Sequence, residues 1–304
     1  MGRTTGIEWT DSTWNPVRGC TRVSEGCCNC YAESVAARFS GPGQPYEGLA
    51  GFKDGDARWT GELKLIENHL EDPIRWKEPK RIFVNSMSDL FHPRVTWDWL
   101  ARIFDVMARA NQHTYQILTK RPERMLEALN AAANPDVVDS FQSTFGQRWP
   151  PAKWWFGVSV ENQETANARL PILARCPAAL RFVSYEPALG PVDLAIACGD
   201  PLALASIGWV ICGGESGSDA RPMHPDWVRD ARDLCVRARI PFFFKQWGEW
   251  APSYLGDTPM PDGLPSSAGF YFDAPHPPCK VWKFGKRRAG ARLDGVEWKE
   301  YPNV

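Results

Sequence analysis

The sequence predicts an α/β fold: a partial (β/α)6-type, TIM-like barrel with an irregular C-terminal extension and a small β-hairpin. Two observations predict it. Short apolar runs alternate with segments of helical periodicity, and a polar residue follows almost every apolar run. Short strands that are apolar throughout are typical of a parallel sheet covered on both faces, and at least six such units in about 250 residues favour a barrel.

The individual elements follow from periodicity and from residues that begin or end them. Strands are expected at residues 7–14, 81–85, 115–118, 154–158, 180–183, 209–212 and 241–244. Helices are expected at residues 32–38, 96–110, 122–132, 164–174 and 224–239, with Thr96 as an N-cap. Residues 41–60 combine glycine, proline and charge without periodicity, so we expect a loop there.

The pattern changes after Trp250, and this change predicts two domains. Residues 1–250 would form the barrel with an N-terminal cysteine loop, and residues 251–304 a loop-rich extension. Residues 251–278 are rich in Pro, Gly, Ser and Asp, as loops are. Residues 281–286 and 296–301 alternate like two strands of a hairpin, with turn-forming residues at 293–295.

Polar side chains stand at the predicted ends of the strands. In a parallel barrel these ends meet on one face, where the active sites of such folds lie. Part of the set would serve only as helix caps. The residues are Ser88, Asp89, Lys120, Ser159, Glu161, Ser184, Glu186, Glu215, Lys245 and Gln246.

Four of the nine cysteines fall within eleven residues, and three of them, Cys20, Cys27 and Cys30, form a C-x6-C-x2-C pattern. Thiolates clustered on a loop are ligands for zinc or for an iron–sulfur cluster. Zinc usually takes four protein ligands, and adjacent Cys27 and Cys28 cannot easily reach one tetrahedral ion. Three thiolates on a four-iron cluster leave one iron open for a small molecule. Unligated loop cysteines are the third interpretation.

Composition limits the partners, the cellular location and the type of active site that this protein can have. The formal net charge is −1, so no overall field attracts nucleic acid or membrane. No apolar run is long enough to span a bilayer and no signal peptide is recognisable, so we expect a cytoplasmic protein, with no membrane partner and with reduced thiols. Five histidines without ligand spacing argue against a histidine-rich hydrolase site.

The flanks of the cysteine loop carry a resemblance. Asn15-Pro16-x-x-Gly19-Cys20 and Cys30-Tyr31-Ala32 resemble the cluster loop of the spore photoproduct lyase branch of the radical S-adenosylmethionine (SAM) superfamily. Six residues separate the first two cysteines, where that superfamily usually has three. Nearly the whole chain also resembles a phage-associated family with a three-cysteine motif. The matching segments are Ile7-Glu8-Trp9-Thr10-Asp11, Trp14-Asn15-Pro16, Gly213-Gly214-Glu215-Ser216 and Phe243-Phe244-Lys245-Gln246-Trp247-Gly248.

The resemblance implies a radical SAM enzyme in which Cys20, Cys27 and Cys30 ligate a 4Fe–4S cluster. Reductive cleavage of SAM would generate a 5′-deoxyadenosyl radical, with electrons from an external flavodoxin- or ferredoxin-like donor. The residues expected to contact SAM are Tyr31, Ser88, Asp89, Lys120 and Ser159.

The sequence leaves open the substrate and whether the protein is an enzyme. The resemblance to a DNA-repair branch, with the basic residues 286–292 beside Trp282 and Phe284, suggests a nucleic-acid-related substrate, DNA or RNA, although a charge run is more often a solvated surface. The alternative function is that of a non-catalytic, phage-associated protein in which zinc or an iron–sulfur cluster only holds the fold.

Overall fold

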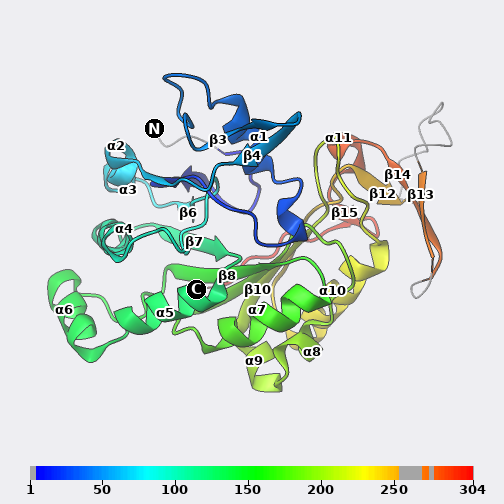
Figure 1. The fold of residues 1–304 in the computed structure, drawn as a ribbon. Helices are drawn as coiled ribbons and strands as arrows, with labels where there is room; N and C mark the ends of the chain where they lie inside the picture. The colour runs from blue at the N-terminus through cyan, green and yellow to red at the C-terminus, as the bar shows by residue number, and fades with distance from the viewer. Residues whose placement is uncertain (1–4, 253–268, 274–276, 304) are drawn as a thin grey trace. The chain divides into compact units, whose positions relative to one another are not determined.

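The computed structural model describes residues 5–252, 269–273 and 277–303 (Figure 1). Within these residues, seven strands form one sheet in the order β1-β6-β7-β8-β9-β10-β11. They are β1 (Ser12–Trp14), β6 (Arg81–Val84), β7 (Thr114–Thr119), β8 (Trp154–Val160), β9 (Leu180–Tyr185), β10 (Ile207–Gly213) and β11 (Phe242–Gln246). Each is a predicted strand, and the sheet adds them in chain order, so the prediction of an α/β fold with a partial, TIM-like barrel is confirmed.

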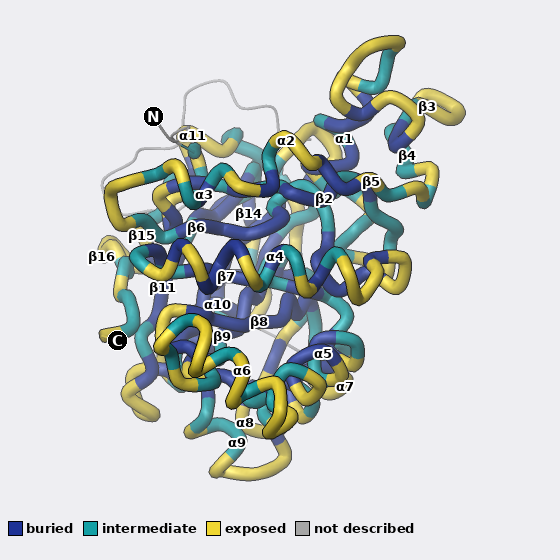
Figure 2. The backbone as a smooth tube through the Cα atoms, turned by 90° about the vertical axis from the view of Figure 1, so that its left-hand side faces the viewer, coloured by how far each residue is buried: buried dark blue, intermediate teal, exposed yellow. Residues whose placement is uncertain are grey.

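Helices follow most of these strands. The predicted ones are α1 (Tyr31–Arg38), α4 (Trp97–Arg109), α5 (Pro122–Ala132), α7 (Gln163–Arg175) and α10 (Pro225–Ala238). Thr96 caps α4 as expected, because its side chain accepts a hydrogen bond from the Trp99 N–H. One face of α4, with Leu100, Ile103 and Met107, is buried, and the tube in Figure 2 alternates between buried and exposed along this helix accordingly.

The structure adds helices that periodicity did not predict. They are η1 (Glu25–Cys27, one 3-10 turn), α2 (Glu67–Leu70), α3 (Asp72–Arg75), α6 (Pro135–Phe145), α8 (Leu194–Cys198), α9 (Pro201–Ala205) and α11 (Lys286–Ala289). Most are only one turn long, so they show too little periodicity to be recognised.

The chain divides into two compact units. The first unit comprises residues 1–158 and 172–181, and the second comprises residues 159–171 and 182–303. The proposed boundary between domains at residue 250 stays a prediction.

In the first unit, β1, β6, β7 and β8 pair in parallel, with Phe83 opposite Thr13 on one side and Gln116 on the other. Two small antiparallel ladders accompany them. β2 (Val17–Arg18) pairs with β5 (Lys64–Leu65), and β3 (Ala50–Lys53) pairs with β4 (Asp56–Trp59). The prediction of a plain loop over residues 41–60 is therefore wrong for the β3–β4 hairpin, which packs with α1 through a small cluster of buried residues. The cluster is Ala36, Ala37, Tyr46, Leu49 and Ala50.

In the second unit, β10 and β11 are parallel, with a shift of register between Cys212 and Gly213. A three-stranded antiparallel sheet follows, in the order β12 (Trp250–Pro252), β14 (Cys279–Lys283) and β13 (Gly269–Phe272). A small hairpin is present in the C-terminal extension, as expected, but it consists of β15 (Arg292–Leu293) and β16 (Val296–Glu297). The predicted pairing of 281–286 with 296–301 is wrong, because β14 pairs with β12 and β13 instead.

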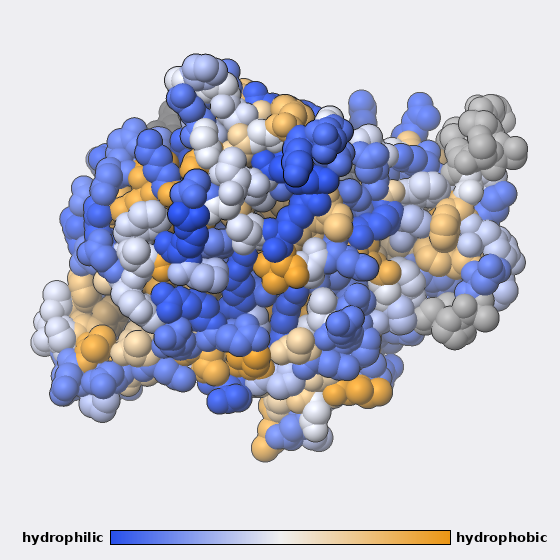
Figure 3. Space-filling model, viewed as in Figure 1, coloured by the Kyte–Doolittle hydropathy of each residue, from blue (hydrophilic) through white to orange (hydrophobic). Residues whose placement is uncertain are grey.

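The loop predicted over residues 251–278 falls mostly on residues 253–268 and 274–276, which lie outside the described residues. Figure 3 shows a face on which hydrophilic residues predominate and hydrophobic residues gather in small groups. Among the residues described, no helix has both the length and the apolar character needed to cross a membrane.

Candidate metal centre

The cysteine loop runs from the end of β2 to the start of α1. Gly19 opens it with a φ of +96°, a left-handed conformation that favours glycine. A Cβ at this position would lie 2.1 Å from the backbone oxygen of Glu62, so a larger residue has no room. An isolated parallel bridge pairs Gly19 with Ser88, which fixes the start of the loop beside the segment that follows β6.

Three of the four clustered thiols differ from the fourth in burial. Cys20, Cys27 and Cys30 are partly buried, whereas Cys28 is exposed. The pKa of Cys20 is raised to about 12: burial is the largest cause, Asp89 and Cys30 also raise it, and Arg121 lowers it. Burial also raises the pKa of Cys30, and Cys27 contributes to this increase.

These pKa effects show that Cys30 lies within electrostatic range of both Cys20 and Cys27. Lys120 is close enough to Cys30 to lower its pKa. Cys28 and Cys27 both lie near Arg22 and raise the pKa of that guanidinium, although the hydrogen bond to Glu33 is the larger cause.

An ion pair clamps the middle of the loop. Arg22 donates to one oxygen of the buried Glu33 carboxylate through Nε at 2.8 Å and Nη2 at 2.5 Å. The other Glu33 oxygen accepts from the Trp59 N–H at 2.8 Å. The loop is thereby tied to α1 and to β4, so the hairpin missed by the sequence analysis supports the cysteines.

A second network holds the beginning of the loop. Arg121 donates through Nη1 to Asp89 at 2.8 Å and through Nη2 to the Thr21 backbone oxygen at 3.0 Å and hydroxyl at 2.8 Å. Asp89 also accepts from the Thr119 hydroxyl at 2.7 Å and from the backbone N–H groups of Phe91 and Lys120. Each Asp89 oxygen therefore accepts two hydrogen bonds within the protein.

His92 completes this network. Burial lowers its pKa to about 4, so the ring is neutral near pH 7. Its Nδ1 accepts from the Arg94 backbone N–H at 3.1 Å, which assigns the proton to Nε2, 2.9 Å from the Thr21 hydroxyl. Thr21, directly after Cys20, thus accepts from both His92 and Arg121. No sequence pattern indicated that Arg121 or His92 belongs to the site.

The other residues expected to contact SAM lie as follows. Tyr31 is exposed, and its hydroxyl donates to the Ser86 backbone oxygen at 2.6 Å. The Ser88 hydroxyl donates to the Val17 backbone oxygen at 2.8 Å. Lys120 lies near Cys30, as described above. The structure thus brings these residues and Asp89 to the neighbourhood of the cysteine loop within the first unit, and Ser159 belongs to the second unit.

The second unit has its own polar strand ends. Buried Glu161 pairs with Arg169 at 3.0 Å, and Arg169 also donates to the Ser159 backbone oxygen. Glu186 pairs with Lys245 at 3.0 Å and accepts from the Ser184 hydroxyl.

Glycine is needed beside the Glu186 pair, because a Cβ on Gly213 would lie 2.7 Å from a Glu186 oxygen. The third acid, Glu215, pairs with Arg221 at 2.7 Å. All three glutamates at the strand ends of this unit are therefore paired with a cation.

The side chains of the cysteine loop are of the types that bind a metal group through thiolates. It offers three partly buried thiols, one of them within electrostatic range of the other two, with cationic side chains beside them. Over the described parts of the chain, no group of three or more His, Cys, Asp or Glu side chains has the arrangement that would hold a single metal ion.

Comparison with solved structures finds spore photoproduct lyase. A cysteine-to-serine mutant of that enzyme matches with a TM-score of 0.41 and 11% identity, and its complex with dinucleoside spore photoproduct with 0.42 and 10%. A mutant with bound AdoMet and dinucleoside spore photoproduct matches with 0.43 and 10%. Each match covers 93% of this chain and 71% of the other. At this similarity the comparison says nothing about activity.

Comparison with curated proteins finds no match. One family, described as "Protein of unknown function (DUF5131)", matches residues 4–302. This match covers nearly the whole chain, which therefore belongs to the DUF5131 family of proteins of unknown function.

Proposed function

We propose that this protein is a radical SAM enzyme in which Cys20, Cys27 and Cys30 hold a 4Fe–4S cluster and SAM binds beside it. The observation that carries the proposal is the set of three partly buried thiols on one loop, coupled electrostatically through Cys30. When bound, the cluster would supply the electron that cleaves SAM into methionine and a 5′-deoxyadenosyl radical.

The chain's own residues would hold the cysteine loop in one conformation. Gly19 allows the chain to turn at its start, Arg22 and Glu33 fix its middle, and Arg121 fixes Thr21 next to Cys20. Because Asp89 accepts four hydrogen bonds from the protein, we assign it to positioning Arg121.

Lys120 is the cation suited to the SAM carboxylate. Its ammonium group lies near Cys30, and an ammonium pairs with a carboxylate as a compact point charge. Tyr31 and Ser88 donate their hydroxyl protons to backbone oxygens. A hydroxyl oxygen can also accept a hydrogen bond, here from the SAM ammonium or ribose hydroxyls. The assignment of Ser159 to the SAM site is also part of this proposal.

A nucleic-acid-related substrate is the second part of the proposal. Lys286, Arg287 and Arg288 are exposed on α11, and Lys280 lies over the Trp282 ring at 4.1 Å. Exposed cations beside aromatic rings combine attraction to phosphates with stacking on bases.

Binding of short DNA and RNA tests this part. Affinity should fall steeply as salt rises, because phosphate contacts release counterions. It should also fall when Arg287, Arg288 and Arg292 become alanine. Binding that is absent at about 50 mM salt, or unchanged in the triple variant, would point to a small-molecule or protein substrate.

Anaerobic reconstitution with iron and sulfide tests the enzymatic part. The wild-type protein should take up about four irons and four sulfides per chain and release 5′-deoxyadenosine from SAM under strong reductant. The Cys30→Ala variant should do neither, and the Cys28→Ala variant should do both. A colourless protein with about one zinc per chain, unable to take up iron, would instead favour a non-catalytic metal-binding protein.

A further inference from the structure

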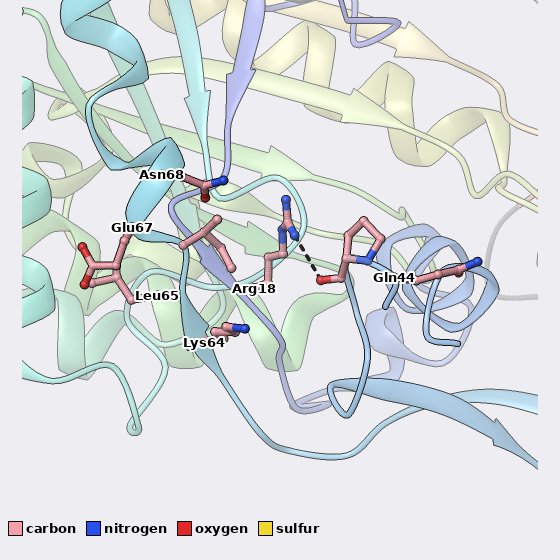
Figure 4. A pocket seen from close by; sticks show the side chains of 8 residues that line it. Arg18, Gln44, Lys64, Leu65, Glu67 and Asn68 are labelled. Carbon is pink, nitrogen blue, oxygen red and sulfur yellow. Dashed lines mark hydrogen bonds between the residues drawn. The ribbon is translucent and has the colours of Figure 1, made fainter. Parts of the chain in front are cut away.

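A pocket of about 390 Å³ lies beside β2 and β5, and it contains none of the residues assigned to the cluster or to SAM. Its volume falls within the range of roughly 300–1,000 Å³ typical of small-molecule sites. Charged and amide side chains share the wall with apolar residues (Figure 4). The lining residues are Arg18, Gln44, Pro45, Lys64, Leu65, Ile66, Glu67 and Asn68.

Two cations line this pocket. Arg18 and Lys64 are directly opposite in the antiparallel β2–β5 ladder, so their side chains project from the same face. Like charges directly opposite on neighbouring strands destabilise a ladder. The Lys64 ammonium group makes no hydrogen bond or ion pair with any residue that the structure describes. No carboxylate among those residues therefore offsets the repulsion by pairing with Lys64.

Arg18 is held in place with most of its donors unused. Its guanidinium lies over the Tyr46 ring at 5.3 Å, and Nη1 donates to the Pro45 backbone oxygen at 3.0 Å, the bond drawn in Figure 4. Within the described residues this is its one hydrogen bond, whereas a guanidinium has five N–H donors. A fixed fork of N–H groups matches the oxygens of a phosphate.

The acid in the pocket does not cancel these charges. Arg102 donates to both oxygens of Glu67, through Nη1 to Oε1 at 2.9 Å and through Nη2 to Oε2. The negative charge of Glu67 is therefore paired with Arg102, which does not line the pocket. In Figure 4 the Glu67 carboxylate points away from Arg18 and Lys64. Two cations thus remain to attract an anion, beside an apolar wall of Pro45, Leu65 and Ile66.

We propose that this pocket binds the phosphate group of a nucleotide, with Arg18 and Lys64 as its charged partners and the apolar wall against the nucleoside. The phosphate would also remove the repulsion between the two side chains. The ligand is a free mononucleotide or one nucleotide of a strand, which share this chemistry. The site is formed without any residue of the cysteine loop's metal-ligand set, so it stands or falls independently of the proposed enzymatic function.

Calorimetric titration of the full-length protein with AMP, a short oligothymidylate and inorganic phosphate tests the proposal. AMP should bind, and Lys64→Gln should weaken this binding about tenfold, the usual effect of losing one charge-assisted hydrogen bond. Lys53→Gln is the matched control, because it removes the same charge from an exposed position on β3 outside the pocket, and it should leave the affinity unchanged. Lys64→Gln should not lower the thermal midpoint, since it removes a repulsion.

The affinities of AMP and oligothymidylate distinguish a free mononucleotide from a nucleotide of a strand. Tighter binding of AMP than of oligothymidylate would identify a free nucleotide, and the reverse order a nucleotide of a strand. Failure of both to bind at about 1 mM, or equal weakening by Lys64→Gln and Lys53→Gln, would overturn the proposal. Inorganic phosphate binding as tightly as AMP would contradict the nucleotide part of it.

Discussion

Replacing Asp89 by asparagine should destabilise the first unit through the charge left on Arg121. The two side chains are only 8% and 11% exposed, and their ion pair is 2.8 Å long. Asparagine keeps the size of the side chain but has one acceptor oxygen, whereas the carboxylate accepts four hydrogen bonds. Removing one partner of a buried pair costs about 3–5 kcal/mol, because the other charge stays buried without compensation.

The thermal midpoint of the metal-free protein measures this loss. At roughly 2–4 °C per kcal/mol, a loss of about 3 kcal/mol lowers the midpoint by about 6–12 °C. Glu62→Gln is the matched control, since it breaks an ion pair of similar length, 2.7 Å, between side chains that are more than half exposed. Solvent screens such a pair, so the midpoint should hardly change.

A double-mutant cycle tests the assigned cause. Adding Arg121→Gln to Asp89→Asn removes the stranded charge, so the double variant should be less destabilised than the sum of the two single variants by about 1 kcal/mol or more. Strict additivity would refute this explanation. A midpoint for Asp89→Asn equal to that of Glu62→Gln would refute the buried pair itself.

Three further predictions concern the same loop. Gly19→Ala should lower both iron retention and the thermal midpoint, because its Cβ would meet the Glu62 backbone oxygen; a fully functional variant would contradict the described loop. Because the pKa of His92 is lowered in the folded protein, His92 binds its proton at a higher pH in the unfolded chain than in the folded one. Compared with His92→Gln, wild-type apoprotein should therefore lose as much as about 3 kcal/mol between pH 6.5 and about pH 4, and parallel pH profiles would contradict this. Cys28→Ala should retain iron and Cys27→Ala should lose it, since only Cys28 is exposed; equal losses would reassign the ligands.

Sequence patterns predicted the helices and strands that neighbouring residues determine. Helix α5 begins and ends at the predicted residues, because Pro122 suits the first helical turn and alanines favour the rest. The capped start of α4 was predicted for a similar reason, a side chain three residues from the N–H it accepts. The main strands are short apolar runs, which are readily recognised between helices.

Elements that depend on distant partners were not predicted. The β3–β4 hairpin has few buried residues of its own, and it is tied to α1 by the hydrogen bond from Trp59 to Glu33, 26 residues away. Strand β14 alternates in a way that suits several partners, and local alternation cannot choose between β12, β13 and residues 296–301.

In the candidate site, too, residues in a local motif were predicted and residues that act over a long sequence separation were not. The three cysteines stand out because their spacing is visible in the sequence. Arg121 reaches Thr21 across 100 residues, and nothing but its position directly after Lys120 at the end of β7 could have indicated it. The contact of Asp89 with SAM, which the resemblance implies, stays a prediction; the hydrogen bonds that its oxygens accept from Thr119 and Arg121 depend on residues 30 and 32 positions away and could not be predicted from local sequence.

The central claim is that Cys20, Cys27 and Cys30 hold a cluster with one iron open to SAM. Electron paramagnetic resonance of the reconstituted, reduced protein with and without SAM tests it most directly. We expect an iron–sulfur signal that changes when SAM is added, is retained in Cys28→Ala and is absent in Cys30→Ala. A signal identical with and without SAM, or one that survives in Cys30→Ala, would contradict it.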